Sequence, residues 1–378
     1  MDVSIDEIRA REILDARGLP GLEAEVFLAD GTYGAGRVSA GPDPAGSSGA
    51  RSAADAAAFI NGDLNDMLCG VSTTDQAGID DELETLEELP AYGALAVSRA
   101  CAGAAAAGLC LPLWKYLGGA GARILPLPRI TALDTPGTDF ASVLIQPSGA
   151  AGLTEGIAIA ATFFDALRDS LLQAGQPLLT GEYGGCVPGP GSIEDRLAFL
   201  CGVIEKAGFV PGEDIETVLC LRPAAEPEDR RRFAGRPAET AAALADSFPI
   251  AWIEDPWGCP SLWEDAEDTA PVCGVPGPEG EPPEGAAGVI ISPGSVSTVS
   301  GIFNAVNRAR ARGLKLVIDS GCAAGETFAA DLAVAVNAEA VRPGSLTGPQ
   351  GGLILNQLLR IEEELGSAGI FSTEAEQI

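Results

Sequence analysis

Residues 314–321 read LKLVIDSG, a short apolar run that ends on polar and turn-forming residues. The same kind of run recurs as VLIQP at 143–147, TVLCLRP at 217–223, IAWIEDP at 250–256 and GVIISPG at 288–294. Continuous apolar runs of this length are typical of parallel strands buried on both faces. Helical segments separate the runs, so the sequence predicts an α/β fold with a TIM-type barrel spanning about 240 residues.

The best of the helical segments is SIEDRLAFLCGVIEKAG at 192–208. It begins with a capping box formed by Ser192 and Asp195, and it ends on a glycine. The segment PGPEGEPPEGAAG at 276–288 contains too much proline and glycine for a helix, so we expect a loop there. Because barrels of this class carry their chemistry where strands end, the residues that follow each apolar run are the candidate site positions.

The N-terminal part of the chain has a different pattern. LEAEVFL at 22–28 alternates apolar and acidic residues, and Asp30-Gly31 follows as a turn signal, which predicts a hairpin. Two helical stretches come next, at 52–68 and, rich in alanine, at 92–107. Glycines at 118, 119 and 121 mark the clearest linker. A small α+β domain is therefore expected to precede the barrel.

The chain of 378 residues carries 54 acidic and 23 basic side chains, a formal net charge of −31. Such a surface repels nucleic acids and anionic lipids, so we expect neither nucleic acid nor a membrane as a partner. No apolar run approaches the roughly 20 residues that cross a membrane. The opening MDVSIDEIRARE lacks the layout of a signal peptide, so the expected location is the cytoplasm. High acidity with few lysines also fits a halophilic source, and that alternative stays open.

The sequence contains no histidine. This absence excludes histidine general bases, Ser-His-Asp triads and histidine metal ligands from the candidate functions. The nine cysteines form no CxxC pair and no zinc-finger spacing. We expect most of them to be small buried side chains.

Six segments carry a resemblance to a known family and occur in that family's order: AREILDARG at 10–18, PLWKYLGG at 112–119, IEKAGFVPGEDI at 204–215, IEDP at 253–256, DLAVAVNAE at 331–339 and NQLLRIEEELG at 356–366. In these segments the chain resembles the enolases. The resemblance implies the enolase fold, with an α+β N-terminal domain at 1–119 and a TIM-type barrel at 124–366 that has an antiparallel start. Residues 367–378 are expected to form a C-terminal tail.

Enolases interconvert 2-phosphoglycerate and phosphoenolpyruvate, and the resemblance implies the groups that this chemistry needs. A lysine removes the carbon-bound proton, and a glutamate acts as acid at the leaving hydroxyl. Magnesium held by three carboxylates stabilises the dianionic intermediate. Each of these roles can be compared with the residue that stands at the matching position.

Most of the matching acid–base positions hold other residues. The catalytic lysine position holds Ser292, which cannot be an equivalent base. The two glutamate positions hold Ser142 and Tyr183. The family histidine aligns to Leu133. The second active-site lysine aligns to Arg342, which keeps a positive charge but does not readily act as a base.

The three metal-carboxylate positions hold Cys220, Glu254 and Val275, so only Glu254 keeps its ligand. Magnesium requires hard oxygen ligands in near-octahedral order, and one carboxylate does not provide them. We therefore expect magnesium binding to be lost or weak, and no other cofactor. Glu254 itself is expected to be a structural relic at a strand end, with cation binding as the alternative.

The phosphate-binding run of the family aligns to 318–321, where Ser320 replaces the arginine and Asp319 adds a negative charge. The serine-bearing mobile loop reads AGPDPAGSSG at 40–49 and does not keep the family motif. Loss of a single acid or base typically costs about 10² to 10⁴ in rate, and here base, acid, metal and phosphate groups are all altered.

The resemblance thus favours an enolase-like pseudoenzyme that acts as a structural or binding subunit. The alternative is a repurposed enzyme or small-molecule sensor that uses the barrel mouth; its candidate residues are Tyr183, Cys220, Glu254, Asp319 and Arg342. A rebuilt enolase chemistry is weaker still, because the chain has no histidine and no lysine near the site, and Lys315 precedes a strand end by several residues. Arg342 is expected to pair with Asp319 or Glu254 and neutralise the pocket, although binding of an anionic ligand stays open. Cys220 with Tyr183 as a new reactive pair is a further alternative.

Enolases are commonly homodimers in which an N-terminal arginine of one subunit meets a C-terminal glutamate of the other. Arg11 and the run Glu362–Glu364 match those segments. The resemblance therefore predicts a homodimer through the N-terminal domain, and membership of a larger protein complex is also open. The alternative is an ordinary charged surface helix.

Overall fold

The computed structural model describes the part of the chain at residues 2–40, 52–136, 138, 140–181, 184–221, 243–255, 272–274, 286–321 and 325–375. The chain folds as two compact units. The first comprises Met1–Ala122, Ser292–Asn307 and Ser320–Val336, and the second comprises Arg123–Ile291, Arg308–Asp319 and Asn337–Ile378. The expected loops at 40–49 and 276–288 lie almost wholly outside the described residues.

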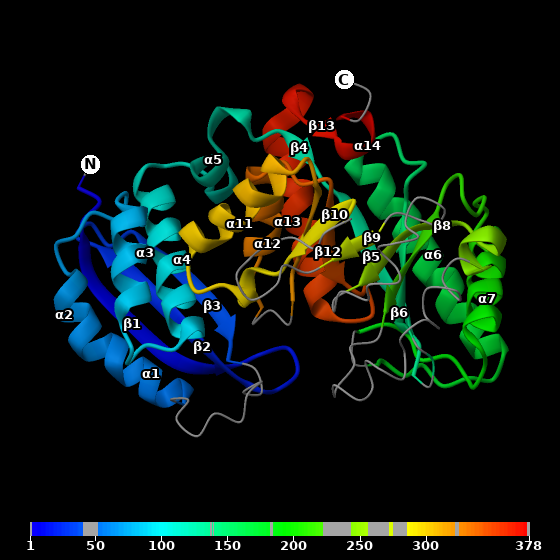
Figure 1. Ribbon diagram of the computed structural model, residues 1–378, viewed down its shortest axis with the longest axis horizontal. Coiled ribbons are helices and arrows are strands. Elements are labelled where there is room, and N and C mark those ends of the chain that lie inside the picture. The colour runs from blue at the N-terminus through cyan, green and yellow to red at the C-terminus, as the bar shows by residue number, and fades with distance from the viewer. Residues whose placement is uncertain are drawn as a thin grey trace. The chain divides into compact units, whose positions relative to one another are not determined.

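The first unit contains a three-stranded antiparallel sheet in the order β1-β2-β3, drawn in blue in Figure 1. Its strands are β1 (Ile5–Leu14), β2 (Pro20–Leu28) and β3 (Tyr33–Ser39). Phe27 pairs with Tyr33 across the turn, and Gly31 takes a positive φ of 84° there. The antiparallel pairing confirms the predicted hairpin. Glycine suits the turn because it adopts this left-handed conformation without steric cost.

Helices cover the sheet and extend the first unit: α1 (Ala53–Phe59), η1 (Ile60–Leu64), α2 (Asn65–Leu68), α3 (Gln76–Thr85), α4 (Ala91–Gly108), α5 (Leu113–Gly118), η2 (Gly119–Gly121), η3 (Pro293–Ser295), the first part of α11 (Val299–Ala311) and α12 (Phe328–Ala335). The helix expected at 52–68 is thus one helical stretch with a π-helical turn in its middle. The stretch expected at 92–107 is α4, which packs against β2 and β3. Both predictions are confirmed.

The backbones of β3 and α4 approach each other closely because both elements carry small residues. A Cβ atom added to Gly34 would lie 2.1 Å from the Ala104 nitrogen and 2.3 Å from the Ala100 oxygen. At Gly36 the added atom would lie 2.2 Å from the Ala96 oxygen. The alanine-rich sequence of α4 is therefore matched to the glycines of β3.

Replacing Gly34 with alanine is expected to lower the free energy of unfolding by about 1–3 kcal/mol, because the new methyl group has to displace backbone. Urea unfolding would measure the loss. Gly62→Ala is a matched control, since a Cβ there meets no described atom within 4 Å in a helical segment. That control is expected to be neutral or stabilising by up to about 1 kcal/mol. Equal effects of the two substitutions would contradict the close-packing argument.

Two later segments join the first unit through polar contacts. The backbone N–H of Val299 donates to Ser98 Oγ at 2.9 Å, and that of Ser300 donates to Asp80 Oδ2 at 2.8 Å, so the first turn of α11 is capped by α3 and α4. Ahead of α12, the Glu326 carboxylate forms a buried ion pair with Arg99. The two contacts at α11 satisfy helix-terminal N–H groups. Together with the ion pair of Glu326, they hold both segments in this unit.

The second unit is built on a closed barrel with the strand order β10-β11-β12-β5-β6-β7-β8-β9. Its strands are β5 (Leu127–Asp134), β6 (Phe140–Gln146), β7 (Glu216–Leu221), β8 (Ile250–Asp255), β9 (Val272–Gly274), β10 (Gly288–Ile291), β11 (Lys315–Asp319) and β12 (Ala340–Gly344). Strand β6 runs antiparallel to both β5 and β7, and the other neighbouring pairs are parallel. The expected barrel with an antiparallel start is confirmed.

The strand pattern alone was wrong about the direction of one run. VLIQP at 143–147 lies in β6 and is antiparallel to its neighbours, whereas the apolar pattern predicted a parallel strand. Only residues 135–139 separate β5 from β6. A parallel pair needs a crossover of a dozen or more residues, so this short connection forces the antiparallel arrangement. The other four runs form β7, β8, β10 and β11 as predicted.

The remaining elements of the second unit are α6 (Leu153–Gln173), α7 (Ile193–Lys206), the end of α11, α13 (Pro349–Leu365), β4 (Ile124–Leu125), η4 (Gly366–Ala368), β13 (Ile370–Phe371) and α14 (Ser372–Ala375). The capping box predicted for α7 is present, with Ser192 and Asp195 bonded reciprocally. The segment expected to form the C-terminal tail at 367–378 contains β13, which pairs with β4. Ser372 Oγ also donates to the Glu339 carbonyl at 2.6 Å.

Among the described helices, none combines the length and apolar character needed to cross a membrane by itself. Helix α4 and the following segment at 113–121 meet these criteria only jointly, and they are bent by 98° relative to each other.

Candidate functional site

Strand pairing brings several of the predicted site positions side by side at one end of the barrel. Ser142 on β6 pairs in register with Cys220 on β7, and Cys220 pairs with Glu254 on β8. On the other side of the barrel, Asp319 on β11 pairs with Arg342 on β12. These positions come from distant parts of the sequence, and barrel closure collects them in the second unit.

Glu254 is fully buried and lies between two arginines. Its Oε1 atom is 3.4 Å from Arg129 Nη1, and its Oε2 atom is 3.4 Å from Arg342 Nη1. The side chains of Arg129 and Arg342 are only 4% and 15% exposed. The predicted pairing of Arg342 with Glu254 is confirmed, and Arg129 is a second partner that the sequence interpretation missed.

Arg129 extends the polar contacts through the barrel interior. Its Nε donates to Gln146 Oε1 at 3.1 Å, and Gln146 Nε2 donates to Glu216 Oε2 at 2.9 Å. The guanidinium carbon of Arg129 also lies 4.7 Å from the ring centre of Trp252, and Lys315 Nζ lies 5.6 Å from the same ring. Barrels of this class usually fill their interior with branched apolar side chains, and these charged and polar side chains depart from that pattern.

The electrostatics of the cluster act on Arg342 and on Cys220. Burial alone would lower the pKa of Arg342, but the charges of Glu254 and Asp319 raise it above its ordinary value, so Arg342 stays protonated. Burial raises the pKa of the Cys220 thiol to about 12, and the nearby Arg342 only partly offsets this shift. A thiol with this pKa is protonated near neutral pH and is a poor nucleophile, which does not favour Cys220 as half of a reactive pair. Tyr183, the other half of that pair, lies outside the described residues, so the alternative stays untested.

The other described site positions lie within a barrel strand or directly after one. Leu133 is fully buried on β5 and bridges to Cys186. Ser292 comes directly after β10 and begins η3, where its carbonyl accepts the Ser295 N–H at 2.9 Å. Ser320 follows β11 and is partly exposed. Tyr183 and Val275 lie outside the described residues.

The donor set around Glu254 does not fit magnesium. Both carboxylate oxygens already face guanidinium groups. The positions paired next to Glu254 on the neighbouring strands hold the protonated Cys220 thiol and the Ser142 hydroxyl. In the described part of the chain, no group of three histidine, cysteine, aspartate or glutamate side chains is placed to hold a metal ion. A divalent cation beside Glu254 would meet two buried positive charges, which opposes binding.

The residues of the expected dimer contact have partners within their own chain. Arg11 forms ion pairs with Glu23 and Glu25 on the neighbouring strand β2, and its side chain remains 48% exposed. Glu362 on α13 accepts a hydrogen bond from the Thr154 hydroxyl. These contacts leave the predicted dimer untested.

Two family models match the chain. The model of the enolase N-terminal domain matches residues 5–117, and that of the enolase C-terminal TIM barrel domain matches residues 284–378. Together the matches span more than half of the sequence, and they include β1 to β3 and β10 to β12. The closed barrel with its antiparallel strand β6 agrees with these matches. The chain belongs to the enolase family.

Proposed function

We propose that this protein is a non-catalytic member of the enolase family that acts as a structural or binding subunit. The observation that carries the proposal is the burial of Glu254 between Arg129 and Arg342. Two fixed guanidinium groups supply the positive charge that magnesium supplies in an enolase, so the barrel needs no metal to balance its carboxylate. The same arginines would oppose the metal-dependent chemistry.

The identities of the nearby side chains support the same proposal. Proton removal from carbon needs a base, whereas Arg342 is held protonated and the Cys220 thiol is protonated near neutral pH. Ser292 stands at the position that the family resemblance gives to the catalytic lysine. A repurposed barrel-mouth enzyme or sensor is less well supported, since the buried Glu254 and Arg342 form an ion pair of 3.4 Å with each other.

The assembly and location of the protein form part of the proposal. An acidic chain with a net charge of −31 favours a protein partner with a complementary basic surface over nucleic acid or membrane. A homodimer through the N-terminal domain would use Arg11 and the Glu362–Glu364 run, with Arg11 shared between its own strand neighbours and the second subunit. We propose the cytoplasm as the place where this subunit works.

The test of this function compares the purified protein with an ordinary enolase in the same magnesium-containing assay. Dehydration of 2-phosphoglycerate is expected to be slower than about a thousandth of the reference rate. The melting temperature of the purified protein is expected to stay within about 1 °C when magnesium is replaced by EDTA, because we expect no metal site in the folded state to add to its stability. Turnover above that threshold, or a melting temperature that rises saturably with magnesium, would overturn the proposal.

A further inference from the structure

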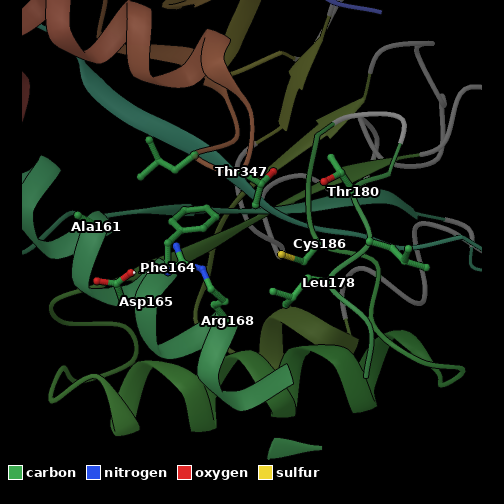
Figure 2. A pocket seen from close by; sticks show the side chains of 10 residues that line it. Ala161, Phe164, Asp165, Arg168, Leu178, Thr180, Cys186 and Thr347 are labelled. Atoms are coloured by element: carbon green, nitrogen blue, oxygen red, sulfur yellow. Dashed lines mark ion pairs between the residues drawn. The ribbon is translucent and has the colours of Figure 1, made fainter. Parts of the chain in front are cut away.

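A cavity of about 400 Å³, open to solvent on one side, lies between α6 and the segment that follows it, and most of its lining residues are exposed. Figure 2 shows Phe164 and Arg168 on the α6 side, with Leu178 and Cys186 facing them from the other segment and Thr347 near the centre. All lining residues belong to the second unit. The volume falls within the range of about 300–1,000 Å³ that is usual for small-molecule sites.

The wall opposite α6 is held in place by hydrogen bonds. The Cys186 N–H donates to the Ala132 carbonyl of β5 at 2.9 Å, and the Val187 N–H donates to the Leu179 carbonyl at 2.9 Å. The Thr347 hydroxyl bonds the Gly184 carbonyl, which ties the segment to the loop after β12. Hydrogen bonds therefore join this wall to β5 and to the loop after β12, and α6 forms the opposite wall.

This wall also touches the end of the barrel. The Gly185 N–H donates to Asp134 Oδ1 at 3.3 Å, and Asp134 pairs in register with Ser142. A Cβ added to Gly181 would lie 2.1 Å from Asp134 Oδ2, so this segment packs tightly on the last residue of β5. Its far side lines the cavity through Thr180 and Cys186.

The lining chemistry selects an uncharged occupant. Arg168 and Asp165 line the pocket as an exposed ion pair of 3.1 Å, so their opposite charges offset each other, and the net charge of −31 repels anions at long range. Leu178 and Leu179 are 45% and 54% exposed, so a ligand that covers them removes apolar surface from water. The Thr180 hydroxyl provides a polar group for orientation.

We propose that this cavity binds a small uncharged molecule with an apolar body and one hydrogen-bonding group. The site lies outside the barrel interior and uses neither Glu254 nor its arginines. The proposal thus stands independently of whether the protein has lost enolase activity. The bound molecule would contact Thr180 and Cys186, and the segment that carries them also contacts Asp134 at the end of β5.

Indole serves as the probe, because it is uncharged, apolar and carries one N–H donor. Ligand-observed NMR titrations compare the unmodified protein with Ala161→Trp, in which an exposed cavity residue on α6 becomes large enough to fill the space. The matched control is Ala158→Trp, an exposed position of the same helix outside the cavity lining. Saturable binding is expected for the unmodified protein and for the control, with binding at least tenfold weaker for Ala161→Trp.

A second variant keeps the proposal testable if the large side chain disturbs folding. Leu178→Ser removes an exposed apolar wall and is expected to weaken indole binding at least fivefold while leaving the melting temperature nearly unchanged. Absence of saturable binding to the unmodified protein would overturn the proposal. Equal affinities of all variants would overturn it too, because the indole would then bind elsewhere.

Discussion

Replacing Glu254 with glutamine is expected to lower the free energy of unfolding by about 3–5 kcal/mol, because two buried guanidinium groups lose their shared counter-charge. The substitution keeps the shape of the side chain, so packing changes contribute little. Arg129 retains Gln146 and the Trp252 ring, whereas Arg342 retains the charge of Asp319 and the Cys220 side chain. The loss is therefore expected to come mainly from electrostatics. Urea unfolding monitored by tryptophan fluorescence would measure it.

The matched control is Glu7→Gln, which removes the carboxylate of an exposed ion pair with Arg9. That pair is 2.6 Å long, and its side chains are 55% and 45% exposed. Exposed pairs contribute about 0–1 kcal/mol, so this control is expected to change stability little. If both substitutions changed the free energy of unfolding by the same small amount, Glu254 would be screened by water. The two arginines would then not be its buried counter-charges.

A double-mutant cycle separates the contribution of each arginine. Arg342→Met combined with Glu254→Gln is expected to be less destabilising than the sum of the single changes, since the double variant leaves one buried charge fewer. The corresponding cycle with Arg129→Met measures the other partner. A larger coupling for Arg342 than for Arg129 is expected, because Arg129 has more alternative contacts in the barrel.

The place of the site could be predicted from the sequence, but the partners of its residues could not. Glu254 stands in the apolar run IAWIEDP, and a carboxylate at the end of such a run indicates a strand-end position. Its partner Arg129 is 125 residues away, and the contact exists only because the barrel closes. A signal was present, since Arg129 is a basic residue near the start of a mainly apolar segment, LPRITALD at 127–134. Such a residue in a buried strand demands a counter-charge.

The fold was predictable where apolar runs were continuous and was missed where they were interrupted. Pro128 and Arg129 interrupt the run of β5, and Arg342 and Pro343 interrupt that of β12, so the strand pattern passed over both elements. Periodicity also carries no information on strand direction. The antiparallel course of β6 follows from the short connection at 135–139 and from the family resemblance, not from the composition of the strand.

Replacing Arg99 with methionine is expected to cost about 3–5 kcal/mol near neutral pH, because the Glu326 carboxylate would then be buried without its counter-charge. The side chains of Arg99 and Glu326 are only 7% and 12% exposed. Arg99 also stacks on Phe328 at 4.4 Å and donates to the Arg37 carbonyl at 3.2 Å. Methionine preserves the apolar stem and much of the volume, so the electrostatic loss dominates.

The loss should depend on pH in a direction set by Glu326. Burial raises the pKa of Glu326 above its ordinary value of 4.5, and Arg99 partly offsets that shift. Without Arg99 the pKa in the folded state rises further, while the unfolded state keeps the ordinary value. The folded variant thus holds its proton at a pH where the unfolded chain has released it, and stability falls as pH rises through this window. The stability gap to the unmodified protein is expected to be smallest at or below about pH 4.5 and to widen towards neutral pH.

Arg9→Met is the control for this experiment, since it removes the cation of the exposed pair with Glu7. Its stability gap is expected to stay small and nearly constant at every pH measured, because solvent screens an exposed pair. A gap for Arg99→Met that did not change between pH 4.5 and 7 would mean that Glu326 does not titrate in this window and that packing alone explains the loss. A widening gap would instead establish that Arg99 keeps Glu326 ionised and thereby holds the segment ahead of α12 in the first unit, since Glu326 also accepts the Arg37 N–H at 3.1 Å.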